Sequence, residues 1–324
     1  MSETFKPGKG PGAEGSRHRD LHASGSRSQL KTGSVRPDGM QADIMLALVV
    51  CLVVGWFFFK SGSGGAGGSG SGSRRRKRPP EPYSTLGEVQ AAIRKQGVES
   101  CNLILGIDFT KSNTWNGSKT FAGRSLHDTS RKGVENPYQR VMRILSQTLE
   151  AFDEDNIIPC YGFGDVYTGG KECFSFFPDR GCAGLPEVLE RYNEIVSKIQ
   201  MSGPTNFAPV IRKAIEIVKE TGQFHVLVII ADGQVDKRAE TVQAIVDASK
   251  VALSIVCVGI GDGPWETMEE FDDAIPQRDF DNFQFVPFHE IEKDTSMPVE
   301  PHFACMALME LPAQYAAMRR LNLL

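Results

Sequence analysis

Apolar residues in the region 83–324 follow two alternating patterns. Four runs, 100–109, 157–165, 224–232 and 251–263, are apolar at almost every position, as in strands covered on both faces. Around them, apolar residues recur every three or four positions, the spacing of amphipathic helices. Those helical segments are 85–97, 136–152, 186–199, 207–222, 239–250 and 305–321. This alternation predicts an α/β fold that is doubly wound, with a mostly parallel central sheet and helices on both faces.

Two helix boundaries can be read from single residues. Asn136 is a favoured N-cap, and Pro137 after it suits the first helical position, so a helix should begin there. Pro312 lies inside the last helical segment, where it removes an N–H donor, so we expect a kink close to it.

The first 82 residues have a different pattern. Residues 1–41 are rich in Gly, Ser, Arg, Lys and Pro, which predicts a disordered basic leader. Residues 44–59 are uncharged and largely apolar, and a helix of sixteen residues covers about 24 Å of the roughly 30 Å hydrocarbon core. We therefore predict one transmembrane helix over 42–60. Residues 61–82 come next as a Gly/Ser linker with a polybasic patch.

The polybasic patch bears on location. Five consecutive basic residues after an apolar run favour a cytosolic position for the region C-terminal to them, and they would attract anionic membrane lipids. The predicted location is thus a single-pass membrane protein whose region 83–324 faces the cytosol. A nuclear-import signal is the alternative reading of the patch, with a nuclear or cytoplasmic location. The patch consists of Arg74, Arg75, Arg76, Lys77 and Arg78.

Charge and cysteine content exclude some classes of protein. Residues 1–82 carry 13 Lys or Arg and 6 Asp or Glu, so the rest of the chain carries 23 and 34, which argues against a body that binds nucleic acid. No CxxC pair occurs, which excludes a zinc finger or RING within these residues. Several of the seven cysteines lie in apolar runs, as reduced thiols of a reducing compartment would.

Oxygen-bearing side chains follow two of the predicted strands. The stretch GIDFTKSN carries Asp108, Thr110 and Ser112, and the run that ends in IIAD carries Asp232. Thr205, in SGPTNFAP, precedes a predicted helix. Each residue alone could be a turn or cap former. Because the carboxyl ends of parallel strands meet at one edge of the sheet, the five together predict an oxygen site for a hard cation.

The composition of this set indicates the kind of ion. Two carboxylates and three hydroxyls are few charges for a calcium cage and suit Mg²⁺ (or Mn²⁺ or Ca²⁺) with an open position. Such a position can accept a carboxylate from a protein ligand. Asp165 and Asp262, which also follow strands, are expected to be turn residues. No nucleophile, base and oxyanion site can be assembled, so we expect no catalytic residues and a protein that is not itself an enzyme.

These motifs resemble a known family. GIDFTKSN, SGPTNFAP and IIADGQV look like the three parts of the metal-ion-dependent adhesion site (MIDAS) of von Willebrand factor A domains, with Thr110 where a Ser is common. NPYQRVMRIL, VGIGDGPW and ALMELPAQY narrow the resemblance to the copine type over 83–324. The segment 83–100 looks most like the copine-domain ubiquitin ligases that end in a RING finger. The family implies one antiparallel edge strand, for which CFSFF is the candidate.

The resemblance also implies functions. A copine-type A domain tethered to a membrane would be a metal-dependent protein-binding module that captures an acidic side chain. The sequence differs from the proteins that it resembles in two ways. Copines carry C2 domains before the A domain, and none fits in residues 1–82; the ligases carry a RING finger after it, and none occurs within these 324 residues. The alternative is therefore a substrate-binding component of protein ubiquitination whose RING comes from another chain, with ubiquitin-pathway partners. A sequence that continues beyond Leu324 is a third reading.

Overall fold

The computed structural model describes residues 85–324, apart from 96, 99–100, 150–152, 154 and 234. The predicted basic leader 1–41, the predicted membrane span 42–60 and the linker with its polybasic patch at 61–82 lie outside the described residues.

The predicted membrane location is wrong, as the described helices indicate. Among the described residues, no helix has both the length and the apolar character that crossing a bilayer requires. The longest helix there, Ala208–Thr221, has 14 residues and is amphipathic, with one side buried and the other exposed. The single-pass assignment is therefore not retained.

The central sheet has six strands in the order β4-β3-β1-β6-β7-β8. All neighbouring pairs are parallel except β3 with β4, which is antiparallel. The mostly parallel sheet and the antiparallel edge strand at CFSFF are thus confirmed. The strands are β1 (Asn102–Asp108), β3 (Cys160–Phe163), β4 (Cys173–Ser175), β6 (His225–Ala231), β7 (Leu253–Gly259) and β8 (Phe283–Pro287).

The predicted run 157–165 contains two strands rather than one. β2 (Ile157–Ile158) pairs with β5 (Cys182–Ala183) in a separate two-stranded sheet, and β3 begins at Cys160. Pro159 separates them because it has no N–H to donate, although its carbonyl still accepts a bond from Leu105 N at 2.9 Å.

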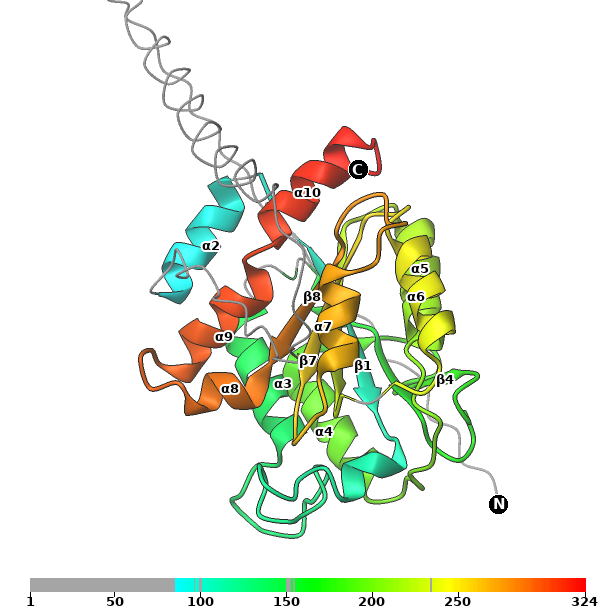
Figure 1. The fold of residues 1–324 in the computed structure, drawn as a ribbon, viewed down its shortest axis with the longest axis vertical. Coiled ribbons are helices and arrows are strands. Elements are labelled where there is room, and N and C mark those ends of the chain that lie inside the picture. Colours follow the sequence, from blue (N-terminus) through cyan, green and yellow to red (C-terminus); the bar gives the residue numbers. More distant parts are fainter. Residues whose placement is uncertain (1–84, 96, 99–100, 150–152, 154, 234) are drawn as a thin grey trace, which may run out of the picture. The chain divides into compact units, whose positions relative to one another are not determined.

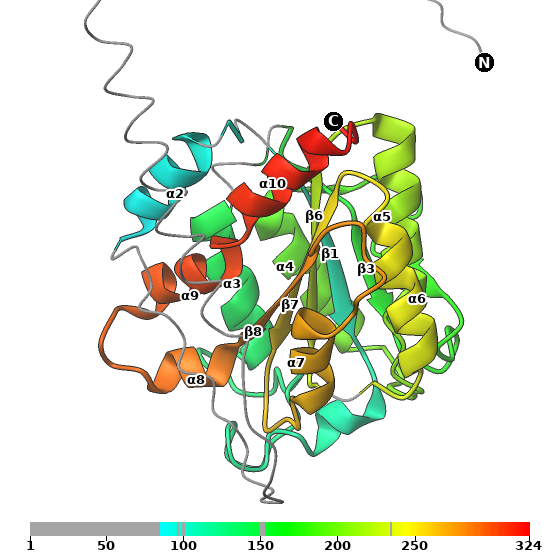
Figure 2. The ribbon, with the colours of Figure 1, turned by 45° about the horizontal axis from the view of Figure 1, so that its top comes forward.

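Helices cover both faces of the central sheet (Figures 1 and 2). The helices α5 and α6 pack together on one face, and α3, α4 and α9 lie on the other. This arrangement confirms the doubly wound α/β prediction. The helices are α2 (Leu86–Lys95), α3 (Pro137–Leu149), α4 (Gly184–Val196), α5 (Ala208–Thr221), α6 (Arg238–Ala248), α7 (Glu266–Asp273), α8 (Phe288–Lys293), α9 (Val299–Leu308) and α10 (Leu311–Arg320).

Both boundary predictions can be compared with this fold. Asn136 Oδ1 accepts a bond from Gln139 N at 2.9 Å and Gln139 Oε1 accepts one from Asn136 N at 2.8 Å, so Asn136 is the N-cap of α3 in a reciprocal capping box. The last predicted helix is broken rather than kinked: α9 ends at Leu308, and α10 carries Pro312 in its first turn. The short elements α7, β8 and α8 were not predicted.

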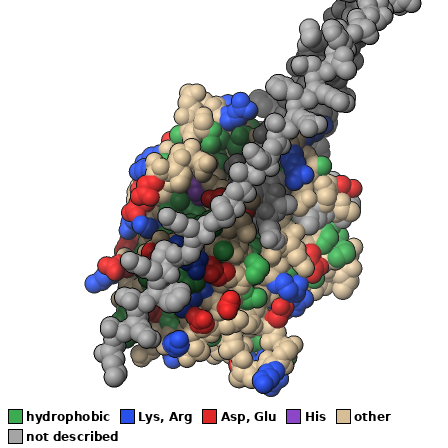
Figure 3. Space-filling view, turned by 180° about the vertical axis from the view of Figure 1, so that it is seen from behind, with side chains coloured by type: hydrophobic (Ala, Val, Ile, Leu, Met, Phe, Trp, Pro, Cys, Tyr) green, Lys and Arg blue, Asp and Glu red, His purple; other side chains and the backbone are tan. Residues whose placement is uncertain are grey.

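Buried strands, rather than surface charges, hold this fold. Every residue of β1, β6, β7 and β8 is buried. On the face seen from behind, acidic and basic side chains are interspersed among scattered apolar ones (Figure 3). Exposed ion pairs of this kind, such as Lys213 with Glu216 at 2.9 Å, each contribute about 0–1 kcal/mol. The packed sheet is therefore what positions the loops at its carboxyl end.

Candidate metal centre

Two aspartates meet at the carboxyl ends of neighbouring strands. Asp108 is the last residue of β1, and Asp232 directly follows β6. The two strands are paired in parallel with Ile107 opposite Ile230, so both carboxylates leave the sheet at the same edge. Both side chains are completely buried. The sequence prediction that they share one edge is supported by this register.

The Asp108 carboxylate is held in a setting that disfavours its charge. Oδ1 accepts a hydrogen bond from Thr110 N at 2.8 Å, whereas Oδ2 is buried and has no hydrogen-bond partner among the described residues. Burial raises the pKa of Asp108 well above its usual range, and the negative charge of Asp232 raises it further. The polar groups of Thr110 and the nearby backbone of Asp232 partly oppose the rise in this pKa. A cation between the two carboxylates would remove both penalties.

The two hydroxyls predicted beside Asp108 lie next to each other. Thr110 Oγ1 and Ser112 Oγ are 3.0 Å apart and both side chains are buried. Thr110 is extended, and Ser112 lies in the short 3₁₀ helix η1 (Lys111–Thr114) that follows it. Asp108, Thr110 and Ser112 thus form one connected group of oxygens.

Gly164 allows the neighbouring loop to approach this group closely. Its φ is +83°, and a Cβ at this position would lie 2.3 Å from Thr110 Cγ2 and 3.2 Å from Thr110 N. Thr110 also pairs with Ser202 in an isolated parallel bridge. The loops after β1 and β3 and before α5 therefore come together at Thr110.

Thr205 lies in the last of these loops. Its N–H donates to Asp236 Oδ2 at 2.8 Å, and its carbonyl accepts from Asp236 N at 3.0 Å and Lys237 N at 3.2 Å. These bonds fix the backbone of a buried threonine between the end of β6 and the start of α5. Asp236, which the sequence reasoning did not single out, positions this loop. These hydrogen bonds are all made by the backbone of Thr205, so its hydroxyl remains a predicted ligand.

A buried polar group beneath the site was missed from the sequence. His127 Nε2 lies 2.8 Å from the carbonyl of Asp108, and its Nδ1 lies 2.7 Å from the Tyr192 hydroxyl. The Tyr138 hydroxyl is 2.9 Å from the same carbonyl and 2.8 Å from Asn113 Oδ1. Burial lowers the pKa of His127 to about 3, so the ring is neutral at pH 7. These side chains fix the backbone that carries Asp108.

The Tyr138→Phe variant tests this supporting role. The substitution removes one buried hydroxyl. The Asp108 carbonyl then keeps only its contact with His127 of these two, and Asn113 Oδ1 loses the hydroxyl that donates to it. We expect the free energy of unfolding to fall by about 1–2 kcal/mol. Divalent-ion affinity should weaken by less than about tenfold, because no ligand is removed. Urea unfolding and metal titration measure the two effects, and an unchanged stability would contradict the assigned role.

The two strand-end aspartates expected to be turn residues differ from each other. Asp165 accepts bonds from Thr168 N at 3.0 Å and Tyr167 N at 3.2 Å, as a local turn residue does. Asp262 instead accepts from Lys119 N at 2.8 Å and Thr120 N at 2.9 Å, more than 140 positions away. Asp262 lies in a bend of the chain, and its side chain in addition ties the loop after β7 to the loop after η1.

The donor set fits a hard cation by its chemistry. All five predicted ligands carry oxygen, which suits Mg²⁺, Mn²⁺ or Ca²⁺. In the part of the chain that the structure describes, no group of three or more His, Cys, Asp and Glu side chains is arranged to hold a metal. The candidate centre contains two carboxylates, so any ion there relies on hydroxyl and water ligands for the remainder.

Comparison with known proteins assigns the family. The family description for copines matches residues 125–324. This chain belongs to the copine family. It is 54% identical over 259 residues to "E3 ubiquitin-protein ligase RGLG1" of Arabidopsis thaliana, which covers 75% of this chain and 52% of that protein. It is 53% identical over 259 residues to RGLG2 of the same plant, covering 75% of this chain and 55% of that protein.

Copines outside plants are also similar. The chain is 48% identical over 246 residues to "Copine family protein 2" of Caenorhabditis elegans, covering 75% of this chain and 3% of that protein. The chain thus spans about half the length of the ligases it matches and far less of the nematode copine. The prediction that this chain is of the copine type is therefore confirmed. The ligase activity in the names of the longer plant proteins is a statement about those proteins.

Proposed function

We propose that this copine domain is a protein-binding module that works through one divalent ion. The ion would be held by Asp108, Thr110, Ser112, Thr205 and Asp232. The observation that carries the proposal is the buried Asp108 carboxylate, whose Oδ2 has no hydrogen-bond partner among the described residues and whose neighbour is a second buried aspartate. Burying two like charges side by side costs several kcal/mol unless a cation compensates them.

Mg²⁺ is the proposed ion, with Mn²⁺ or Ca²⁺ as substitutes. Three of the five ligands are neutral hydroxyls, so the ion would keep more of its positive charge than in a cage of carboxylates. It would also keep water ligands that can be exchanged. A carboxylate from a partner protein is the ligand that best matches an exposed, hard and incompletely neutralised ion.

The loops around the site have exposed apolar side chains that suit a protein partner. Trp115, just after η1, is 57% exposed, and Val166 and Tyr167, just after β3, are 43% and 92% exposed. They belong to the loops that meet at Thr110. Aromatic residues at the surface beside a polar centre are typical of the contacts that carry binding energy in interfaces. They would contact the residues that flank the captured carboxylate.

Metal titration tests the ion-binding half of this proposal. Chelator-treated protein comprising residues 1–324 is titrated with MgCl₂, MnCl₂ and CaCl₂ in a calorimeter. One saturable site per chain is expected, and the protein should melt at a higher temperature when the ion is present, since binding to the folded state stabilises it. Absence of a saturable site for all three ions would refute the proposal.

The Tyr167→Ser variant tests the protein-binding half. Proteins captured from lysate by immobilised wild-type protein in Mg²⁺ and lost in EDTA define the metal-dependent partners. The variant should capture them several-fold more weakly, while Mg²⁺ affinity stays unchanged, because Tyr167 contacts solvent and not the ion. Ile157→Ser is the matched control, since Ile157 is 44% exposed at the opposite end of the strands. Equal losses in both variants would contradict a partner surface at Tyr167.

A second candidate function is supported by the similar ligases. The two plant relatives at 54% and 53% identity are named E3 ubiquitin-protein ligases. We propose as the alternative that this domain selects substrates for ubiquitin transfer, with the RING activity supplied elsewhere. Conjugating enzymes or RING proteins that co-purify with the chain would favour this function, and metal-dependent partners without them would favour the simple binding module.

A further inference from the structure

A cavity on the side of α10 has not been used by the proposed function. It has a volume of about 610 Å³ and lies between α10 and the segment that leads into β8. Its walls combine apolar side chains with three carboxylates and an amide. The lining residues include Phe280, Asp281, Met309, Glu310, Ala313 and Gln314. The metal centre is at the carboxyl end of the sheet, formed from other loops, so this cavity is a separate feature.

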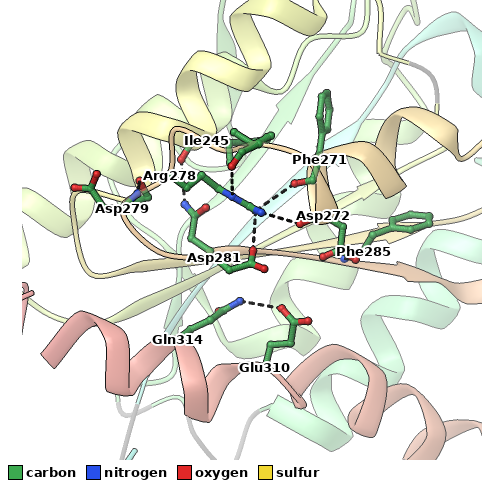
Figure 4. A network of polar contacts seen from close by, with 12 residues as sticks. Ile245, Phe271, Asp272, Arg278, Asp279, Asp281, Phe285, Glu310 and Gln314 are labelled. Atoms are coloured by element: carbon green, nitrogen blue, oxygen red, sulfur yellow. Dashed lines mark hydrogen bonds and ion pairs between the residues drawn. The ribbon is translucent and has the colours of Figure 1, made fainter. Parts of the chain in front are cut away.

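The buried guanidinium of Arg278, close to this cavity, already has hydrogen-bond and ion-pair partners. The Arg278 side chain donates to the carbonyls of Asp272 at 2.8 Å and Phe271 at 3.2 Å, and thereby caps the end of α7. It also pairs with Asp281 Oδ1 at 2.7 Å. Figure 4 shows Arg278 and Asp281 facing Gln314 of α10 and Glu310, the residue just before α10. Arg278 therefore balances at most one of the carboxylates that surround it.

The remaining carboxylates repel one another. Burial, and next the negative charge of Asp281, raise the pKa of Glu310 to about 7. Burial, and next the charge of Glu310, raise the pKa of Asp272 to about 8. A positive charge among these groups would therefore be favourable. Arg320 is the basic residue among those that line the cavity.

Gln314 gives a second, independent sign that the cavity takes a ligand. The side chain is 4% exposed and lines the cavity. Its Oε1 is buried without a hydrogen-bond partner among the described residues, while its Nε2 lies 3.4 Å from Glu310 Oε2. A buried acceptor without a donor costs about 1–3 kcal/mol. Acceptors and carboxylates around one cavity call for a ligand rich in N–H donors.

We propose that this cavity binds a basic side chain, an arginine or lysine, from a segment of a partner protein. Its cationic head would lie among Asp281, Glu310 and Gln314, and its aliphatic stem would lie along Met309 and Ala313. Arginine matches the site better than lysine, because its five donors can serve several acceptors at once. A metal ion is the poorer occupant, since the described residues offer no group of three metal-ligating side chains there.

A peptide-binding measurement on the protein comprising residues 1–324 tests this site. The probe is a fluorescein-labelled peptide of glycine, serine and four arginines, compared by polarisation with the same peptide carrying citrulline, which has the shape of arginine without its charge. Only the arginine peptide should bind, and EDTA should leave its binding unchanged. Loss of binding in EDTA, or equal binding of the citrulline peptide, would overturn the proposal.

Two variants and one control locate the binding. Glu310→Gln removes one charge and keeps the shape, and Gln314→Leu removes the acceptor. Each should raise the Kd of the arginine peptide about fivefold or more, whereas Glu194→Gln on the exposed surface of α4 should not. Thermal melting checks that each variant is folded. Equal weakening by all three would reduce the binding to general attraction between a basic peptide and an acidic protein, and would refute the cavity as the site.

Discussion

Asp108→Asn is expected to have opposite effects on ion binding and on the stability of the metal-free protein. The affinity for Mg²⁺ should fall by about 100-fold or more, which is about 2.7 kcal/mol of binding free energy. The free energy of unfolding without metal should rise by about 1–3 kcal/mol, because the variant removes one of two buried like charges. A residue with a purely structural role would lose stability when changed, so the opposite signs are the test.

The matched control for this prediction is Asp165→Asn. Asp165 is also a buried aspartate, two residues after the end of β3, but its two oxygens accept bonds from Tyr167 N and Thr168 N. We expect this variant to lose about 1–2 kcal/mol of stability and to keep its Mg²⁺ affinity within about threefold. Calorimetric titration and urea unfolding, each in EDTA and in Mg²⁺, measure both variants. If Asp108→Asn also loses stability in EDTA, the electrostatic account of the centre is wrong.

Asp272→Asn is expected to change how stability depends on pH. The pKa of Asp272 is raised from 3.8 to about 8 in the folded protein. Between about pH 4 and pH 8 the folded protein therefore holds a proton that the unfolded chain has released, and this group lowers stability as pH rises through that window. The amide cannot ionise and can still accept the bond from Phe285 N, which lies 3.3 Å from Asp272 Oδ2.

The size of this effect depends on the same shift. Relative to wild type, Asp272→Asn should gain about 2–4 kcal/mol of unfolding free energy at pH 8.5 and close to nothing at pH 4. Urea unfolding across this range measures the difference. Asp273→Asn, at the exposed neighbouring position, is the control and should give a much flatter difference. A gain for Asp272→Asn that does not depend on pH would contradict the raised pKa.

The sequence predicted the architecture because the spacing of apolar residues along the chain reflects which side chains are buried. Runs such as 224–232 are apolar at nearly every position because both faces of β6 are covered. The start of α3 is predictable because the Asn136 side chain itself caps the helix. The short elements were missed for the opposite reason. β8 has five residues and leads directly into α8, so no turn signal separates them.

The candidate site could be predicted in part from the sequence for a similar reason. Asp108, Thr110 and Ser112 are close in sequence, and Asp232 comes directly after a strand, so chain topology alone predicts that they meet. The residues that support these ligands could not be predicted from the sequence. His127 and Tyr138 reach the Asp108 carbonyl from 19 and 30 positions away, and nothing in their local pattern marks that contact.

By itself, then, the sequence determined the doubly wound sheet, the order of its main elements and the oxygen-rich ends of β1 and β6, because these depend on local periodicity and on the residues at the end of each strand. Only the tertiary structure decided that Asp262 ties two distant loops, that His127 is buried and neutral, and that Glu310, Asp281 and Gln314 share one cavity. Those properties arise from the packing of segments far apart in the chain, which sets burial and the distance between charges and leaves no trace in the spacing of residues.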